Sequence, residues 1–427
     1  MHSKAGSWGL WKLGLVLAVL LLLAALCTTT WIVSLRDRKW TALESRVETL
    51  FTELHTPPLE RLPLGRTLLP GNAWDDYVSA GVSAPGQPPR IIASKLLAWL
   101  RRDPNANPVE AESLITEFST NIEAIRQGTR RQSATAPSPQ YAKGGIRYPL
   151  LLHYGFQDLS SLCIGKARLF EEAGELTEAV RLLVDVCLFG RDLAGARMSG
   201  GSTTALHVMR SAFAELEDLL ERHNLSAEDL AYLTQSLKVL DDHFPDHLND
   251  LRWDLLELGI LLQREDDQNE DCFFLPNNQP RGRRNWRHCF STRLQAAASF
   301  SDAESLVQRA LATDAQPWSL AGPGNRELCA EASKDPLLEH SLLHLAAPQW
   351  TIPIRGQLRL LRVVVQYLET GKLLELDDPV GGKIRSRPSE QTVLFWRRAL
   401  FAALDWEPKD AKRRYGYGLT IEVPRRQ

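Results

Sequence analysis

The sequence predicts a mainly α-helical fold: an N-terminal transmembrane helix, packed helical hairpins that form a bundle or a short solenoid, and a small α+β tail at the C-terminus. Three observations predict it. Residues Leu13–Leu35 form an uncharged, largely apolar stretch. Leucine, alanine, glutamate and arginine are abundant, whereas valine, isoleucine and tyrosine are scarce, which favours helix over sheet. Apolar residues also recur every three or four positions through the middle of the chain, as on amphipathic helices.

The apolar stretch is long enough to cross a bilayer. As a helix, Leu13–Leu35 spans about 35 Å at about 1.5 Å per residue. Trp8 and Trp11 flank one end and Trp31 and Trp40 the other, where indole rings favour the headgroup layer. The apolar core is longer than that of a cleaved signal peptide, and small residues are poorly placed for cleavage. We therefore expect an uncleaved anchor that contacts the lipid bilayer through Leu13–Leu35.

Charge leaves the orientation of this anchor open. Two lysines and the α-amine precede the stretch, and four basic side chains follow it, at Arg36, Arg38, Lys39 and Arg46. Positive charge is therefore nearly balanced, and the positive-inside rule does not decide. A short tail before a first hydrophobic segment is the usual layout of a signal anchor. We expect the bulk of the chain outside the cytoplasm.

Overall charge argues against nucleic acid as a partner. The chain has 427 residues, of which 50 are Lys or Arg and 52 are Asp or Glu. Because these charges nearly cancel, no global field attracts phosphate backbones. About 390 residues follow the anchor, which is enough for a sizeable core of packed units.

Composition divides the chain into four expected segments. Residues 1–40 hold the N-terminal tail and the anchor, and residues 41–145 hold membrane-proximal helices with Pro/Gly-rich linkers. The helical hairpins occupy residues 146–350, including a polar loop at 264–290, and residues 351–427 form a helix and a small β-containing tail.

Within the outer segments the sequence predicts several short elements. A short helix is expected over 72–78, a helix over 108–126 and a connector over 127–145. In the tail, residues 383–387 and 419–423 are expected to pair as strands, with a strand or a helix over 392–406 between them.

The clearest helices lie in the central region. Three apolar stripes follow one another there, with a break at Pro245 before the third. The stripes are Leu206, Met209, Phe213, Leu216 and Leu220; Leu230, Leu233, Leu237 and Leu240; and Leu248, Leu251, Leu255, Leu258 and Leu262. A capping box at Ser226-Ala-Glu-Asp229 begins the second helix. Short links between helices of this kind favour antiparallel packing.

Upstream of these stripes, Cys163–Leu193 has the layout of one tetratricopeptide-like hairpin. Ala167 and Phe170 lie on its first helix, and Gly174 at its turn can adopt a left-handed conformation. No second copy occurs at a 34-residue offset. We expect Phe170 and Gly174 to lie on a surface that binds a protein partner.

A resemblance to a loose group of uncharacterised bacterial proteins is carried by the run Ala167-Arg-Leu-Phe-Glu-Glu-Ala-Gly-Glu-Leu-Thr-Glu-Ala-Val180 and the helices after it. The likeness continues at Leu361–Lys383, where an aliphatic helix leads into Asp377-Asp-Pro-Val-Gly-Gly-Lys383. It implies a membrane-anchored, mostly helical architecture and no activity. We expect the anchor to lie in the bacterial cytoplasmic (inner) membrane. The Asp-Pro-x-Gly turn is also similar to the C-terminal loop of type II secretion pseudopilins. The processing site and first-helix glutamate of that family do not occur here.

Two histidine pairs have the spacing of metal ligands on a helix. His340 and His344 stand four residues apart, but Ser341 occupies the position where a zincin carries glutamate. Between His243 and His247 lies a proline, which favours a helix end there over a metal site. The pair His340 and His344 has no identifiable third ligand, and we expect no metal and no cofactor.

A polar loop carries two opposed charge blocks. Five carboxylates lie in residues 265–271, and four arginines follow in residues 281–287. Arg283, Arg284 and Trp286 are candidates for docking an acidic partner, although a solvated loop whose blocks neutralise each other is the alternative. The adjacent acid pairs Asp75/Asp76 and Asp377/Asp378 are typical of helix caps and turns rather than of acid/base dyads.

The cysteines of this loop leave their redox state open. Cys272 and Cys289 bracket the loop, and a disulfide between them is expected in an oxidising compartment. In the cytosol both are free thiols. Cys163 and Cys187 fall on apolar helix faces, where thiols act as small fillers.

Together these features favour a non-enzymatic function. We expect a membrane-anchored helical scaffold that binds an unidentified protein partner in the bacterial envelope. One alternative is a metal-assisted envelope hydrolase that uses His340 and His344. Another is an accessory component of a membrane assembly or secretion machine.

Overall fold

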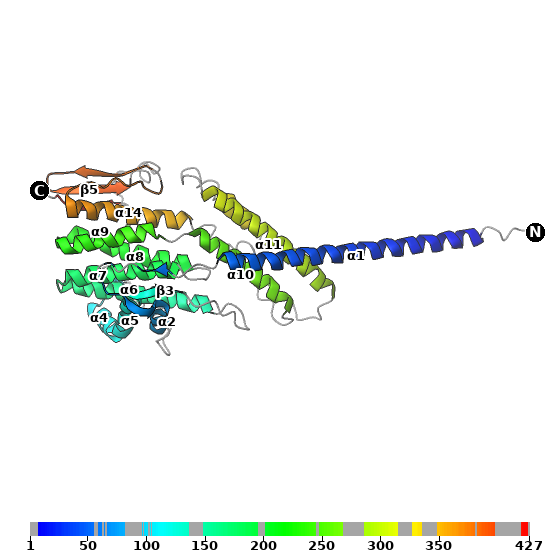
Figure 1. The fold of residues 1–427 in the computed structure, drawn as a ribbon, viewed down its shortest axis with the longest axis horizontal. Helices are drawn as coiled ribbons and strands as arrows, with labels where there is room; N and C mark the ends of the chain where they lie inside the picture. Colours follow the sequence, from blue (N-terminus) through cyan, green and yellow to red (C-terminus); the bar gives the residue numbers. More distant parts are fainter. Residues whose placement is uncertain are drawn as a thin grey trace, which may run out of the picture. The chain divides into compact units, whose positions relative to one another are not determined.

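A computed structural model describes most of the chain (Figure 1). The described residues are 7–54, 59–61, 66–81, 98–100, 105–135, 148–194, 201–244, 247–267, 286–314, 327–334, 348–380, 382–397 and 420–425, with residues 64, 96 and 103. They form a mainly helical structure with a long apolar helix at the N-terminal end and a small three-stranded sheet at the C-terminal end, which confirms the predicted fold class. The chain divides into two compact units, Met1–Glu53 with Leu255–Ser305, and Leu54–Asp254 with Leu306–Gln427.

Helix α1 runs from Ser7 to Glu53 without a break. Its large apolar side chains between Leu15 and Ile32 are exposed, and the helix is long and apolar enough to cross a membrane. Beyond the apolar stretch, the first of the expected membrane-proximal helices is a continuation of α1. The continuity has a simple origin, because neither glycine nor proline occurs between Gly14 and Pro57.

The second half of α1 is amphipathic and packs within the smaller unit. Trp40, Leu43, Val47 and Leu50 are buried at helical spacing. Parts of α10 (His247–Asp267) and α11 (Trp286–Asp314) belong to the same unit. The helices approach closely at Gly259, where an added Cβ would lie 2.4 Å from Val47 Cγ2 and 2.9 Å from Phe300 Cε2. Arg46 also pairs with Glu304 on α11.

Five helices of the larger unit lie side by side (Figure 1). They are α6 (Tyr148–Glu172), α7 (Leu176–Ala194), α8 (Gly201–Arg222), α9 (Ala227–Asp242) and α14 (Pro348–Thr370). Helix α7 packs against α6, α8 and α9, and α14 packs against α8 and α9. The first two predicted apolar stripes are buried at every position, and so are the described positions of the third. These helices therefore pair through the faces that the sequence indicates.

Helix ends also follow the sequence signals. Gly174 turns the chain between α6 and α7 with φ +79°, in the left-handed region. Ser226 Oγ accepts the N–H of Asp229 at 3.1 Å, and its hydroxyl donates to the Asp229 carboxylate at 2.6 Å. His243 ends α9, and α10 begins at His247 beyond Pro245.

A small sheet and short helices precede α6, and two expectations are wrong here. The sheet has the order β1-β3-β2, from Leu59–Glu60, Arg131–Ala134 and Leu69–Asn72, so the connector expected over 127–145 contains a strand. The helix expected over 108–126 divides at Phe118. The short helices are α2 (Ala73–Gly81), α4 (Pro108–Glu117) and α5 (Ser119–Gly128). Strand β3 forms through pairing with segments some 60 residues away, which local composition does not reveal.

The C-terminal sheet has the order β4-β5-β6, with antiparallel pairs throughout. Its strands are Ile384–Pro388, Thr392–Arg397 and Thr420–Pro424. The two outer strands were expected to pair with each other, but both pair with β5. This central strand alternates buried and half-buried residues and carries β-branched and aromatic side chains, which suit a position between two neighbours.

One buried arginine links this sheet both to α14 and to the turn that follows it. Arg397 at the end of β5 contacts the Asp378 carboxylate with two nitrogens, Nε at 2.7 Å and Nη2 at 2.9 Å. Its Nη1 donates to the carbonyl of Pro353 inside α14 at 2.8 Å. The guanidinium lies directly against Gly356, where an added Cβ would be only 2.0 Å from Nη2. Glycine at this position is therefore a requirement of the ion pair.

We expect Gly356→Ala to destabilise the protein by about 3–5 kcal/mol, because the methyl group displaces a buried guanidinium from its partner. Helix propensity alone predicts the opposite result, because alanine stabilises an exposed helix by about 1 kcal/mol relative to glycine. Gly174→Ala is the control: its added Cβ meets nothing within 4 Å, and it costs only the left-handed backbone penalty of about 1–2 kcal/mol. Thermal unfolding followed by circular dichroism compares the two. A Gly356→Ala protein as stable as wild type would contradict the assignment.

Candidate functional site: a buried ionic network on α7

Helix α7 is buried on every side and nevertheless carries charges. Each residue from Ala179 to Leu193 except Arg181 is buried, and three of them are Asp185, Arg191 and Asp192. Charged groups in an apolar interior are stable only when they are paired or fully hydrogen-bonded. The partners of these three side chains therefore define the chemistry of the larger unit.

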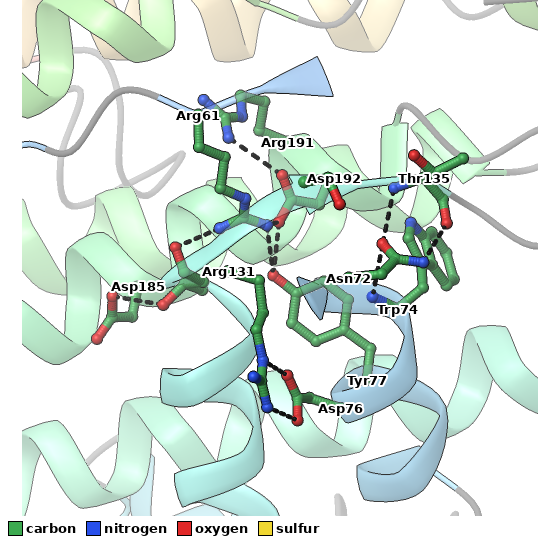
Figure 2. A network of polar contacts seen from close by, with 12 residues as sticks. Arg61, Asn72, Trp74, Asp76, Tyr77, Arg131, Thr135, Asp185, Arg191 and Asp192 are labelled. Atoms are coloured by element: carbon green, nitrogen blue, oxygen red, sulfur yellow. Dashed lines mark hydrogen bonds and ion pairs between the residues drawn. The ribbon is translucent and has the colours of Figure 1, made fainter. Parts of the chain in front are cut away.

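Asp192 forms the first node of this network (Figure 2). It is fully buried, and its Oδ2 accepts hydrogen bonds from Arg61 Nη2 and, at 2.5 Å, from the hydroxyl of Tyr77. The same Arg61 nitrogen donates to the Tyr77 oxygen at 3.0 Å. Arg191 Nη2 donates to Oδ1 of Asp192 at 3.2 Å. The Asp192 carboxylate thus accepts hydrogen bonds from two arginines and one phenol.

Asp185 forms the second node, two helical turns earlier. Its Oδ1 accepts from Arg66 Nη1 at 2.6 Å and from Thr129 Oγ1 at 2.8 Å. Arg126 Nε lies 3.8 Å from Oδ2. Thr129 joins the nodes, because its carbonyl accepts a hydrogen bond from Arg61 Nη1.

The network extends from α7 to α9 through Arg66. Arg66 Nη2 contacts the hydroxyl of Tyr232 on α9, and the guanidinium carbon lies 5.2 Å from the centre of the Tyr232 ring. Burial raises the pKa of Tyr232 to about 12, against the lowering effect of Arg66. Tyr232 therefore remains a protonated phenol near neutral pH.

Two further contacts close the small sheet over α2. Asn72 donates to the carbonyl of Thr135 at 2.8 Å and accepts from its N–H at 2.9 Å. Arg131 in β3 contacts both carboxylate oxygens of Asp76 at 2.6 and 3.0 Å. Figure 2 shows both contacts beside the Asp192 node. They hold the ends of β2 and β3 against the start of α2.

Aromatic rings fill the space next to the polar atoms. The Tyr77 ring lies 4.8 Å from that of Phe189, centre to centre, and Phe189 lies 5.5 Å from Phe156, both edge-to-face. Trp74 meets Phe156 at 6.1 Å. This packing excludes water around Tyr77 and strengthens the electrostatic contacts beside it.

The protonation states indicate a structural clamp rather than reactive groups. Burial and the Asp192 charge raise the pKa of Tyr77 well above its usual value, so the phenol stays a donor. Burial alone would lower the pKa of Arg61, but the interactions with Asp192 and Tyr77 together outweigh it and the pKa is raised. Burial also raises the pKa of the Cys163 and Cys187 thiols, which disfavours the nucleophilic thiolate.

Asp192→Asn should destabilise the protein by about 3–5 kcal/mol, because it leaves two buried arginines without their carboxylate. Asp75→Asn is the matched control: Asp75 is exposed in the first turn of α2, and its loss should cost no more than about 1 kcal/mol through the helix dipole. Thermal unfolding of both variants in the same detergent measures the difference. Equal melting temperatures for the two variants would show that the Asp192 node does not support the fold.

Asp158 on α6 is a carboxyl group of a different kind. It is buried, and its Oδ2 accepts no hydrogen bond from any residue that the structure describes. Burial raises its pKa to about 7. Since the unfolded carboxyl ionises near pH 4, folding favours the protonated form between these values.

Asp158→Asn should therefore stabilise the protein in a pH-dependent way. Wild type loses stability as pH rises from about 4 to about 7 and loses no more above that range. The gain in melting temperature from Asp158→Asn should grow over the same interval and then stay constant. A gain that does not change with pH would contradict an unpaired buried carboxyl at this position.

The residues expected to form sites lie apart from this network or outside the described part of the chain. Phe170 is half-buried near the end of α6, with the Lys166 ammonium 4.6 Å from its ring centre, and Gly174 is exposed at the following turn. Arg283 and Arg284 lie outside the described residues, while Trp286 begins α11.

The expected histidine and cysteine sites remain predictions. His340, His344 and Cys272 also lie outside the described residues, and Cys289 belongs to α11. His243 closes α9, with Nδ1 3.0 Å from the carbonyl of Val239. Among the residues that the structure describes, no group of three His, Cys, Asp or Glu side chains is placed to hold a metal ion.

Sequence reasoning missed the α7 network, although one signal for it exists. Asp185, Arg191 and Asp192 interrupt a run that is otherwise apolar, and charges inside such a run require partners elsewhere in the chain. Nothing local points to Arg61 or Arg66 as those partners. Comparison of the chain with protein-family models, with curated proteins and with solved structures gives no match.

Proposed function

We propose that the chain is a single-pass protein of the bacterial cytoplasmic membrane, whose largely extracytoplasmic helical body is a non-enzymatic scaffold for another protein. The observation that carries this proposal is the division of α1 into two chemically different halves. Between Leu15 and Ile32 its large apolar side chains are exposed, as a lipid contact requires, whereas from Trp40 to Leu50 one face is buried. Anchor and body are therefore joined by continuous helix.

The chemistry of the body supports a scaffold. The charged groups on α7 are engaged in contacts that hold segments together, and the phenols of Tyr77 and Tyr232 are kept protonated. Side-by-side helices joined by short turns offer their ends and edges as binding surfaces. The turn between α6 and α7 is one such surface, with residues 172–175 exposed and Phe170 half-buried beside them.

Arginine at both Leu21 and Leu22 should release the full-length chain from membranes, since each charge costs about 2.5–3.5 kcal/mol at the centre of a bilayer. Flotation of carbonate-washed membranes measures the association. Leu373→Arg is the matched control, because Leu373 is equally an exposed leucine but lies after α14. Membrane association that survives the double substitution would contradict the anchor.

Cross-linking in the same membranes tests the scaffold separately. Wild type should give one defined cross-linked partner, and Phe170→Ala or charge reversal at Arg283 and Arg284 should reduce its recovery. If wild type stays in the membrane and yields no partner, the scaffold proposal fails while the anchor stands.

A further inference from the structure

Three arginines on one face of α14 share a single carboxylate. Arg355, Arg359 and Arg362 follow one another at intervals of four and three residues, so they project from the same side of the helix. All three contact Asp241 in the last turn of α9. Asp241 is buried, with 4% of its surface exposed.

The contacts with Asp241 use only part of each guanidinium. Arg355 contacts Oδ1 through Nε at 3.2 Å. Arg359 contacts both oxygens through Nε at 3.3 Å, and its Nη1 donates to the carbonyl of Asp377 at 2.8 Å. Arg362 reaches Oδ2 through Nη1. Since Arg355 is held by Nε alone, its terminal pair of nitrogens has no partner among the described residues.

The guanidinium nitrogens that do not contact Asp241 are accessible to solvent. The side chains of Arg355, Arg359 and Arg362 are 42%, 22% and 15% exposed. Buried nitrogens without hydrogen bonds occur elsewhere in the described chain, for example in Arg61, but none belongs to these three residues. The arginines are thus fixed at one end and accessible at the other.

Among the residues that the structure describes, the charge of this cluster is only partly compensated. The three guanidiniums and the one carboxylate they contact leave a formal charge of +2. Asp242 is exposed next to Asp241 and weakens the field, but none of the three arginines contacts its carboxylate. Asp377 contributes its carbonyl to Arg359, and its own side chain is exposed. An anion is the ligand that such an arrangement favours.

We propose that Arg355, Arg359 and Arg362 form a binding site for the phosphate group of a ligand, with Asp241 as the residue that positions them. A phosphate monoester carries a charge of about −1.5 to −2 and three acceptor oxygens near neutral pH, which matches the charge of the cluster. Guanidinium groups bind such oxygens in a planar, bidentate geometry. Tethering by Asp241 reduces the side-chain entropy that binding would otherwise cost. This site is independent of the proposed scaffold function.

A phosphate group can reach the site on a soluble ester or on a phospholipid, and titration of the full-length chain in neutral detergent distinguishes them. Inorganic phosphate is the soluble probe. Micelles doped with phosphatidic acid are the lipid probe, with phosphatidylcholine as their control. Saturable binding of inorganic phosphate assigns a soluble ligand, and binding only to phosphatidic acid micelles assigns a lipid headgroup; either supports the site.

Arg355→Gln should weaken the binding of the effective probe about tenfold or more, since it removes a charge-assisted contact. Unfolding is not expected, because this side chain is 42% exposed and, within the described part of the chain, its other interaction is with the Phe244 ring. Arg355→Lys keeps the charge but loses the planar guanidinium, so its affinity for the probe should lie between those of wild type and Arg355→Gln. Arg309→Gln is the matched control, because Glu331 already occupies both terminal nitrogens of Arg309, at 2.9 and 2.7 Å.

The proposal is overturned if neither probe binds saturably, if Arg355→Gln binds as wild type does, or if Arg309→Gln weakens binding equally. It is also overturned if an oligoglutamate peptide binds in an Arg355-dependent way while both phosphate probes fail. That result would assign the surface to an acidic protein.

Discussion

Charge compensation on α7 is the constraint on which the rest of the larger unit depends. Asp185 and Asp192 are seven residues apart, so both lie on one face of the helix, two turns from each other. The arginines that neutralise them, Arg61 and Arg66, come from one short segment, and Thr129 contacts both nodes. Removal of Arg61 or Arg66 takes a charged partner from a buried carboxylate, and removal of either aspartate takes the carboxylate from its arginines. The small sheet and α2 are therefore held on the helices by electrostatics as much as by apolar contact.

Arginine and aspartate form two kinds of contact in this chain, a structural ion pair and a candidate binding site. The number of arginines around each carboxylate distinguishes the two. Arg397 and Asp378 are both buried, and their pairing joins strand β5 to the turn that follows α14. Asp241 meets three arginines and engages only one nitrogen of each. A balanced buried pair has no capacity left for a ligand, whereas an excess of fixed donors does. Counting donors and acceptors thus distinguishes a structural contact from a candidate site.

Much of the fold follows from patterns within single helices, and the exceptions involve distant segments. The buried stripe that contains Leu206 and Phe213, the cap at Ser226 and the turn at Gly174 are each specified within a few residues. Strand β3 has no such local signal, because it exists only through pairing with β1 and β2. The α7 network is similar: its acids stand out in an apolar run, but their partners lie about 120 residues away. Contacts between residues far apart in the chain could therefore not be predicted from the sequence alone.

The unbroken course of α1 has a mechanical consequence. From Arg36 to Glu53 the helix continues for about 27 Å beyond its apolar half at about 1.5 Å per residue. A helix without glycine or proline is stiff over that length, so a change in its tilt carries through to the packed face at Val47 instead of being absorbed at a hinge. Bilayer thickness alters the tilt of a spanning helix. In a bilayer, a change in lipid composition that alters the tilt of α1 would therefore also alter the packing of the three helices around Gly259.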